Sequence, residues 1–135
     1  MNEEKKVLEK LQQYIRLVHT QEESDSIGLW AEKCEVALIS GAKQFTGKAA
    51  TMNAFLKELI RNAYETIDLI SESVDVRFLN DSCAVLVFAY HTECIRRETG
   101  EPYGIAGLET QVYIKENDEW RLAHVQYSGV PKNQS

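Results

Sequence analysis

The chain has 135 residues and a mass of 15.4 kDa, which is enough material for one domain with a substantial core. Apolar residues make up 44% and charged residues 27%, so the composition is that of a globular protein and excludes a disordered one. The 15 basic and 21 acidic residues give a net charge of −6, which argues against nucleic acid or anionic membrane as a partner, because binding to both depends on positive charge.

A single domain over residues 1–135 is expected, in the cytoplasm of the cell. No apolar run approaches the ~20 residues of a membrane span, and the first residues lack the basic-then-apolar order of a signal peptide. Cys34, Cys83 and Cys94 form no C-x-x-C pair, which indicates reduced thiols. The three histidines are far apart in sequence, so neither a metal site nor a cofactor is predicted.

Two amphipathic helices are predicted in the first half of the chain. Residues 3–22 carry apolar side chains every three or four positions, Tyr14 among them, and therefore form one apolar face. A second, short helix should follow with Ile27, Leu29 and Trp30, capped by the polar residues 24–26.

A strand over residues 34–40 and a loop over residues 41–47 then lead to the second long helix. This helix carries its own apolar stripe and is expected to end near residue 65.

The second half of the chain is predicted to consist of strands joined by short turns. The apolar period changes to two after residue 66, and strands are expected at residues 67–78, 83–96, 105–115 and 120–128. In the third of these, Leu108, Thr110, Val112 and Ile114 share one face, and Glu109, Gln111 and Tyr113 share the other.

Short connections between successive strands predict an antiparallel sheet, and the separate helices make the fold α+β. So long a sheet with few helices must curl, so we expect a cone-shaped sheet wrapped around the first helix, with a cavity inside. Residues 85–90 are apolar on both faces, which predicts that a second copy of the chain covers the convex face of the sheet.

The element order and the C-terminal motifs resemble the nuclear transport factor 2-like superfamily, which includes SnoaL-like cyclases and ketosteroid isomerases. More narrowly, Glu109-Thr110-Gln111-Val112-Tyr113, Trp120 and the run from His124 to Pro131 resemble the association (hub) domain of calcium/calmodulin-dependent protein kinase II. The resemblance implies a stand-alone bacterial relative without a kinase domain. Where the hub cavity is known for arginines, this chain is expected to carry His91, Gln111 and Tyr127.

The expected cavity is lined by Tyr14, Trp30, His91, Glu109, Gln111 and Tyr127. Resemblance to the ketosteroid isomerases implies a hydrogen-bonding acid at Glu109 and a phenol at Tyr14, which together would stabilise an enolate. The alternative, which the residue types favour, is that Glu109 is a structural carboxylate in a salt bridge and Tyr14 a core residue.

The isomerase reaction also needs a carboxylate base near the end of the first strand, and residues 38–41 are Leu-Ile-Ser-Gly. His91 is the alternative base, or else a polar lining residue. Two functions stay open: a module that binds a small hydrophobic or carbonyl-containing ligand and oligomerises, or an acid/base enzyme (isomerase, dehydratase or cyclase) acting on a hydrophobic carbonyl compound.

Overall fold

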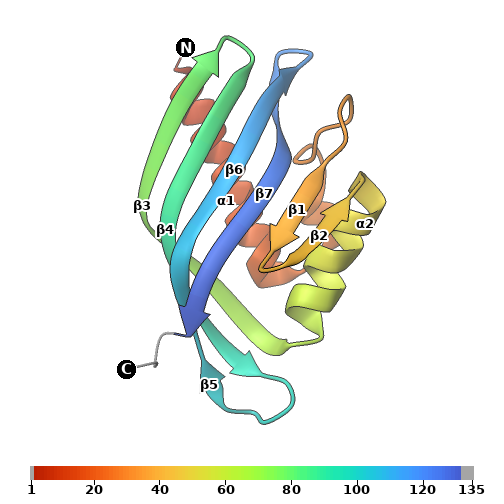
Figure 1. Cartoon of the computed structure of the whole chain (residues 1–135), viewed down its shortest axis with the longest axis vertical. Coiled ribbons are helices and arrows are strands. Elements are labelled where there is room, and N and C mark those ends of the chain that lie inside the picture. Colours follow the sequence, from red (N-terminus) through yellow and green to blue (C-terminus); the bar gives the residue numbers. More distant parts are fainter. Residues whose placement is uncertain (1, 132–135) are drawn as a thin grey trace.

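The computed structural model describes residues 2–131, and in it a long helix lies across one face of a seven-stranded sheet (Figure 1). The helical elements are α1 (Glu3–Thr20), η1 (Glu23–Ser26), α2 (Lys48–Asn53) and η2 (Ala54–Arg61). The strands are β1 (Ala37–Ser40), β2 (Lys43–Thr46), β3 (Tyr64–Asn80), β4 (Cys83–Arg96), β5 (Pro102–Tyr103), β6 (Ile105–Glu116) and β7 (Glu119–Pro131). Within the described residues, no helix is long and apolar enough to cross a membrane.

The predicted α+β architecture with a strongly curved sheet around α1 is confirmed, with one correction to the strand directions. The strands follow the order β2-β1-β7-β6-β4-β3, with β5 beside β4. All neighbours are antiparallel except β1 and β7, which run parallel and pair Ala37 with His124 and Ser40 with Tyr127. No hairpin joins these two strands, because most of the chain separates them, so nothing forces the antiparallel direction.

The α1 helix buries one face against the sheet, as its apolar spacing predicts. Asn2 caps its first turn by accepting a hydrogen bond from the Glu4 amide at 3.0 Å, and Gln21 ends it in a left-handed conformation. Its buried residues are Val7, Leu11, Tyr14, Leu17 and Val18.

The region between the two long helices differs from the prediction. Residues 41–47, expected as a loop, contain β2, which forms a hairpin with β1. The short helix expected around Ile27 is replaced by η1, a single 3₁₀ segment that ends at Ser26. Gly28 has a φ of 76°, which a helix does not accommodate. The hydrophobic residues Leu29 and Trp30 are nevertheless buried. Trp30 forms an isolated parallel β-bridge with Leu122 of β7.

The second long helix has two parts that differ in winding. After α2, η2 winds as a π-helix, as shown by the bond from the Asn62 amide to the Lys57 carbonyl at 2.8 Å. A π-helical turn spaces side chains differently from an α-helix and often occurs beside functional sites. Here it brings Phe55, Leu59 and Ile60 to the inner side of the fold.

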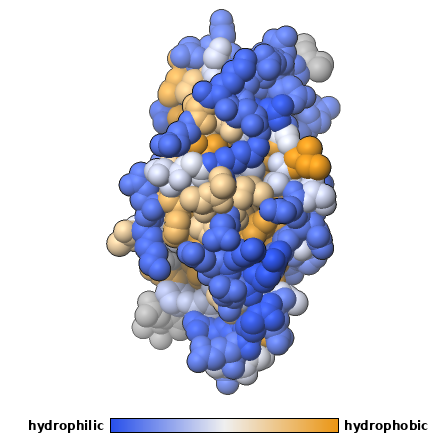
Figure 2. All heavy atoms as spheres, turned by 90° about the vertical axis from the view of Figure 1, so that its right-hand side faces the viewer, coloured by the Kyte–Doolittle hydropathy of each residue, from blue (hydrophilic) through white to orange (hydrophobic). Residues whose placement is uncertain are grey.

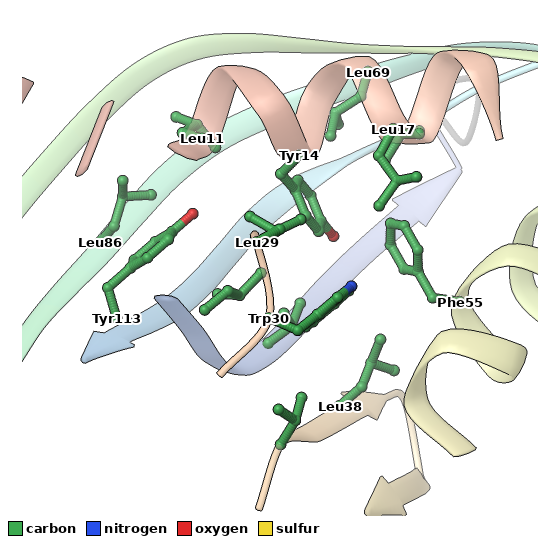
Figure 3. Packing of buried hydrophobic residues seen from close by; sticks show 14 of the residues in the cluster. Leu11, Tyr14, Leu17, Leu29, Trp30, Leu38, Phe55, Leu69, Leu86 and Tyr113 are labelled. Atoms are coloured by element: carbon green, nitrogen blue, oxygen red, sulfur yellow. The ribbon is translucent and has the colours of Figure 1, made fainter. Parts of the chain in front are cut away.

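The core fills the space between α1, the segment around Trp30 and the inner face of the sheet. Figure 3 shows Tyr14 pointing from α1 toward Trp30 and Phe55, with Leu38 of β1 on the far side. The Tyr14 and Phe55 ring centroids are 5.2 Å apart, and those of Trp30 and Phe55 are 6.1 Å apart. Such tilted and edge-on aromatic contacts hold ring positions more specifically than aliphatic packing does.

Hydrophobic residues are exposed on two parts of the outer surface. The side that carries β1, β2 and α2 has a hydrophobic area enclosed by hydrophilic residues (Figure 2). On the outer face of the sheet, Val85 and Val87 are half-buried, and Leu108 is 56% exposed. This outer face therefore keeps the apolar character that the sequence predicts for the centre of β4.

Candidate functional site

A cavity of about 400 Å³ lies between α1, η2 and the inner face of the sheet. This volume is within the range of sites that bind small molecules. Most of its lining is hydrophobic or aromatic, and the polar groups are few. The lining residues are Tyr14, Val18, Ser40, Gly41, Phe55, Leu59, Ile60, Tyr64, Ile67, Leu69, Tyr90, Thr92, Ile105, Glu109, Tyr127, Ser128 and Gly129.

Three polar residues of the cavity form a row across three strands. Glu109 of β6 pairs with Tyr127 of β7, and Tyr127 pairs with Ser40 of β1. Residues that are paired directly across neighbouring strands point to the same face of a sheet. Tyr14 of α1 reaches the same row from the opposite wall, since its hydroxyl interacts with Glu109.

Glu109 is the buried carboxyl at the centre of this row, with only 3% of its surface exposed. Its Oε2 accepts a hydrogen bond from Gln111 Nε2 at 2.8 Å, and Gln111 Oε1 accepts one from the Tyr113 hydroxyl at 2.6 Å. Burial raises the pKa of Glu109 to about 7, although the donors on Tyr14 and Gln111 partly offset this by favouring the carboxylate. Glu109 therefore changes protonation state near neutral pH.

The tyrosines around Glu109 stay protonated near neutral pH. Burial and the nearby Glu109 raise the pKa of Tyr90 to about 12, and burial likewise raises the pKa values of Tyr14 and Tyr127 well above that of a free phenol. The Ser40 hydroxyl interacts with Tyr127 and partly opposes its shift. These phenols can thus donate hydrogen bonds to a ligand, and they cannot act as bases there.

Two glycines give Tyr90 its place at the cavity. Gly107 and Gly129 pair across β6 and β7, and Tyr90 of β4 pairs with Gly107. A Cβ on Gly129 would come within 2.6 Å of the Tyr90 hydroxyl, and one on Gly107 would come within 1.9 Å of the Ser128 carbonyl oxygen. The tyrosine therefore covers a part of the sheet that has no side chains of its own.

The structure brings some of the predicted site residues together and separates others. Tyr14, Glu109 and Tyr127 line the cavity. Trp30 and Gln111 are fully buried and do not line it; Gln111 holds Glu109, and the Trp30 indole nitrogen has no hydrogen-bond partner among residues 2–131. They support the site without lining it.

The expectation that His91 lines the cavity is corrected by the structure. His91 points to the outer face of the sheet, where its Nδ1 lies 2.5 Å from Glu72 Oε2 and its Nε2 lies 3.2 Å from Glu93 Oε2. Its neighbour Tyr90 takes the inward position, because successive side chains of a strand alternate between the two faces. His91 therefore cannot act as a base in the cavity. It also does not occupy the cavity position that the resemblance to the kinase hub implied.

Sequence reasoning missed Tyr64, Tyr90 and Thr92 as lining residues. Tyr90 and Thr92 share the face of Phe88, so the alternation in β4 would have placed all three together once one was known. Tyr64 starts β3, which begins three residues earlier than predicted. Nothing in the sequence indicates that its ring reaches the cavity.

The end of β1 adds no acid or base to the cavity. Ser40 and Gly41 line it there, and among the described lining residues Glu109 is the only carboxylate and none is Lys, Arg or His. Over residues 2–131, no three His, Cys, Asp or Glu side chains gather in a group that could hold a metal ion. Among these lining residues, Glu109 is therefore the group that titrates near neutral pH.

Comparisons of the structure with solved structures identify the fold. No protein-family model matches the sequence, and no curated protein matches it either. A nuclear transport factor 2-like superfamily protein from Salmonella enterica serovar Typhimurium LT2 superposes with a TM-score of 0.86 at 22% identity, over 96% of this chain and 92% of that one.

Two further similar structures bear the names of enzymes. Hexachlorocyclohexane dehydrochlorinase LinA-type3 from Novosphingobium barchaimii LL02 has a TM-score of 0.84 at 9% identity, over 98% of this chain and 92% of that one. A protein described as a putative scytalone dehydratase from Novosphingobium aromaticivorans has a TM-score of 0.80 at 13% identity, over 95% and 84%. The chain thus has the nuclear transport factor 2-like fold, and likeness at such low identity carries no activity with it.

Proposed function

We propose that this protein binds a small, largely apolar molecule in the cavity, with Glu109 as the polar anchor. The observation that carries this proposal is one buried carboxyl in an otherwise apolar and aromatic cavity of about 400 Å³. A few polar groups in such a lining fix the orientation of a ligand, while the apolar surface supplies most of the binding free energy.

A cavity-filling substitution tests the binding proposal. Phenylbutanol serves as a neutral, mostly apolar probe, and calorimetry or ligand-observed NMR measures its binding. Leu59→Trp adds a large side chain to the lining and should abolish saturable binding, whereas Leu79→Trp, at an exposed position outside the cavity, should leave it unchanged. No saturable binding of this probe or of phenylbutylamine to the wild type, or equal binding to both variants, would contradict the proposal.

Acid/base catalysis on a hydrophobic carbonyl compound is the second candidate function. It is favoured by the position of Glu109, since a carboxyl with a pKa of about 7 both accepts and donates protons readily at neutral pH. The names of two similar structures, a dehydrochlorinase and a putative dehydratase, are compatible with it. Binding ranks first because the cavity offers a single acid/base group, and an isomerase, dehydratase or cyclase usually divides the proton transfers between two.

The proposal also includes self-association, as in an oligomerisation module of the kinase-hub type. The support for it is the outer face of the sheet, where half-buried Val85 and Val87 lie beside the exposed Leu108. A second copy of the chain would cover this face. The proposed setting remains the cytoplasm of a bacterium, in which thiols such as Cys34 and Cys83 stay reduced.

A further inference from the structure

The charges around the cavity are unbalanced. Glu109 is the only formally charged group among the described residues that line it. When Glu109 is ionised, its carboxylate therefore has no cation to pair with inside the cavity, in surroundings that disfavour charge. This imbalance selects against an anionic ligand and in favour of a cationic one.

Glu109 also has unused capacity for hydrogen bonds. Its carboxylate accepts from the Gln111 amide and interacts with the Tyr14 hydroxyl. An ionised carboxylate offers about four acceptor positions, so these two donors leave room for more. An ammonium group carries up to three N–H donors and no acceptor, and it would fill that remaining capacity.

Aromatic rings share the cavity with the carboxyl, and Tyr14, Tyr90 and Tyr127 each interact electrostatically with Glu109. Tyr14, Phe55, Tyr64, Tyr90 and Tyr127 all line the same cavity. The faces of aromatic rings carry partial negative charge and attract cations that lie within about 6 Å. A carboxylate that shares its cavity with several aromatic rings is therefore better suited to an organic cation than to a neutral polar group.

We propose that the cavity takes an apolar molecule that carries one protonated amine, with the ammonium group paired to Glu109 among the tyrosine rings. This inference rests on the proposed binding function and names the chemical class of the ligand. The apolar part of the molecule would lie against Leu59, Ile67 and Leu69.

Such a ligand couples binding to the protonation of Glu109. Without ligand, burial keeps much of Glu109 neutral at pH 7, and an ammonium group would draw it into the ionised form with release of a proton. The groups that face Glu109 are Tyr14 from α1, Tyr90 from β4, Gln111 and Tyr113 from β6, and Tyr127 from β7. All four tyrosines titrate well above neutral pH, so Glu109 alone sets the pH dependence.

The test compares three probes with the same apolar part: phenylbutylamine, phenylbutanol and phenylbutyrate. Isothermal titration calorimetry at pH 6 and pH 8 gives their dissociation constants. If the amine binds only the ionised form, its affinity should rise about tenfold from pH 6 to pH 8, whereas that of the alcohol should not rise. The amine should bind about tenfold more tightly than the alcohol at pH 8, and the anion least tightly.

Glu109→Gln keeps the size of the side chain and removes its charge, so it should abolish both the amine preference and its pH dependence. Glu98→Gln, at an exposed turn position, should change neither. Equal or tighter binding of the alcohol at pH 8, or an amine preference that persists in Glu109→Gln, would overturn the inference and leave the proposed binding function intact. Failure of both amine and alcohol to bind would overturn both.

Discussion

Glu109 and Tyr127 lie directly opposite each other on β6 and β7, and both side chains point into the same cavity. This pairing puts the most easily titrated group of the cavity beside a phenol that stays protonated at neutral pH. Because β1 runs parallel to β7, Ser40 extends the same row on the other side of Tyr127. The polar part of the cavity is thus built from the register of three strands.

Replacing Glu109 should change how stability depends on pH. The pKa of Glu109 is about 7 in the folded chain and near its ordinary value of 4.5 in the unfolded chain, so the folded state holds a proton that the unfolded state has lost. The wild type should therefore lose about 3 kcal/mol of unfolding free energy as pH rises from 4.5 to 7, and little more above that.

Glu109→Gln lacks this titration. Between pH 4 and pH 8, its unfolding free energy relative to the wild type should shift by about 3 kcal/mol in favour of the variant. Urea unfolding at several pH values measures the difference. A constant difference over this range would show that folding does not shift the pKa of Glu109, contrary to our account of the cavity.

Removing the Tyr14 hydroxyl should raise the pKa of Glu109 above 7, because that hydroxyl helps to stabilise the carboxylate. Tyr14→Phe should also lower the unfolding free energy at pH 8 by about 1 kcal/mol. NMR of the Glu109 carboxyl carbon follows the titration directly. Tyr103→Phe, which changes a phenol of β5 that stacks on Tyr64 and is not among the lining residues, is the matched control and should leave the Glu109 titration in place. An unchanged or lower pKa in Tyr14→Phe would show that the two groups do not interact.

Alternation in β6 separates Glu109 and Gln111 from the more apolar residues, and the resemblance to known families placed them on the inner face. Both residues are buried, so that placement was correct. The same reasoning failed for His91, because β4 is apolar on both faces and its sequence does not distinguish inside from outside.

Pairings between distant segments were the other feature that the sequence did not reveal. The polar residues 43–46 have no strand pattern of their own, yet they form β2 by pairing with β1. The parallel pairing of β1 with β7 likewise depends on how the whole sheet closes around α1. The closer resemblance to the kinase hub stays a prediction.

Glu116 should prove to be a structural carboxylate that holds the segment after Trp30. Its two oxygens accept hydrogen bonds from the backbone amides of Glu32 at 3.0 Å and Lys33 at 2.7 Å. In Glu116→Gln one oxygen becomes an NH₂ group that faces a backbone N–H, so about 1–3 kcal/mol of unfolding free energy should be lost.

Denaturant unfolding measures this loss. The control is Glu98→Gln, a substitution at an exposed position that should change the unfolding free energy by less than about 0.5 kcal/mol. Equal stability of the two variants would show that the amides of residues 32 and 33 do not depend on the Glu116 carboxylate.

The protein should not isomerise a β,γ-unsaturated ketosteroid above the background rate. In the arrangement that the resemblance to the ketosteroid isomerases implies, Glu109 and Tyr14 donate to the enolate oxygen, so the carbon-bound proton needs a separate base. Ser40 and Gly41 at the end of β1 supply none. Loss of a general base ordinarily costs about a hundred- to ten-thousand-fold in rate. Absorbance of the conjugated product measures the reaction.

Ser40→Asp would add a carboxylate to the cavity at the end of β1 and is the variant expected to gain isomerase activity. Since His91 lies on the outer face, His91→Ala should have no effect on any activity found. Steroid isomerisation by the wild type would show that the cavity contains a working base, and it would favour the enzyme over the binding module.

The chain should form at least a homodimer through the outer face of the sheet. Leu108 lies on that face opposite Ala89 of β4, and it is 56% exposed in the single chain. In a dimer, Leu108→Glu would bury a charge without a partner, so the dissociation constant should rise by about tenfold or more. Light scattering at micromolar concentration gives the mass of each form.

Ile27→Glu changes a 77% exposed residue beside α1 and should leave the dimer intact. A monomer mass for the wild type, or equal dissociation in both variants, would show that the outer face of the sheet is not the interface.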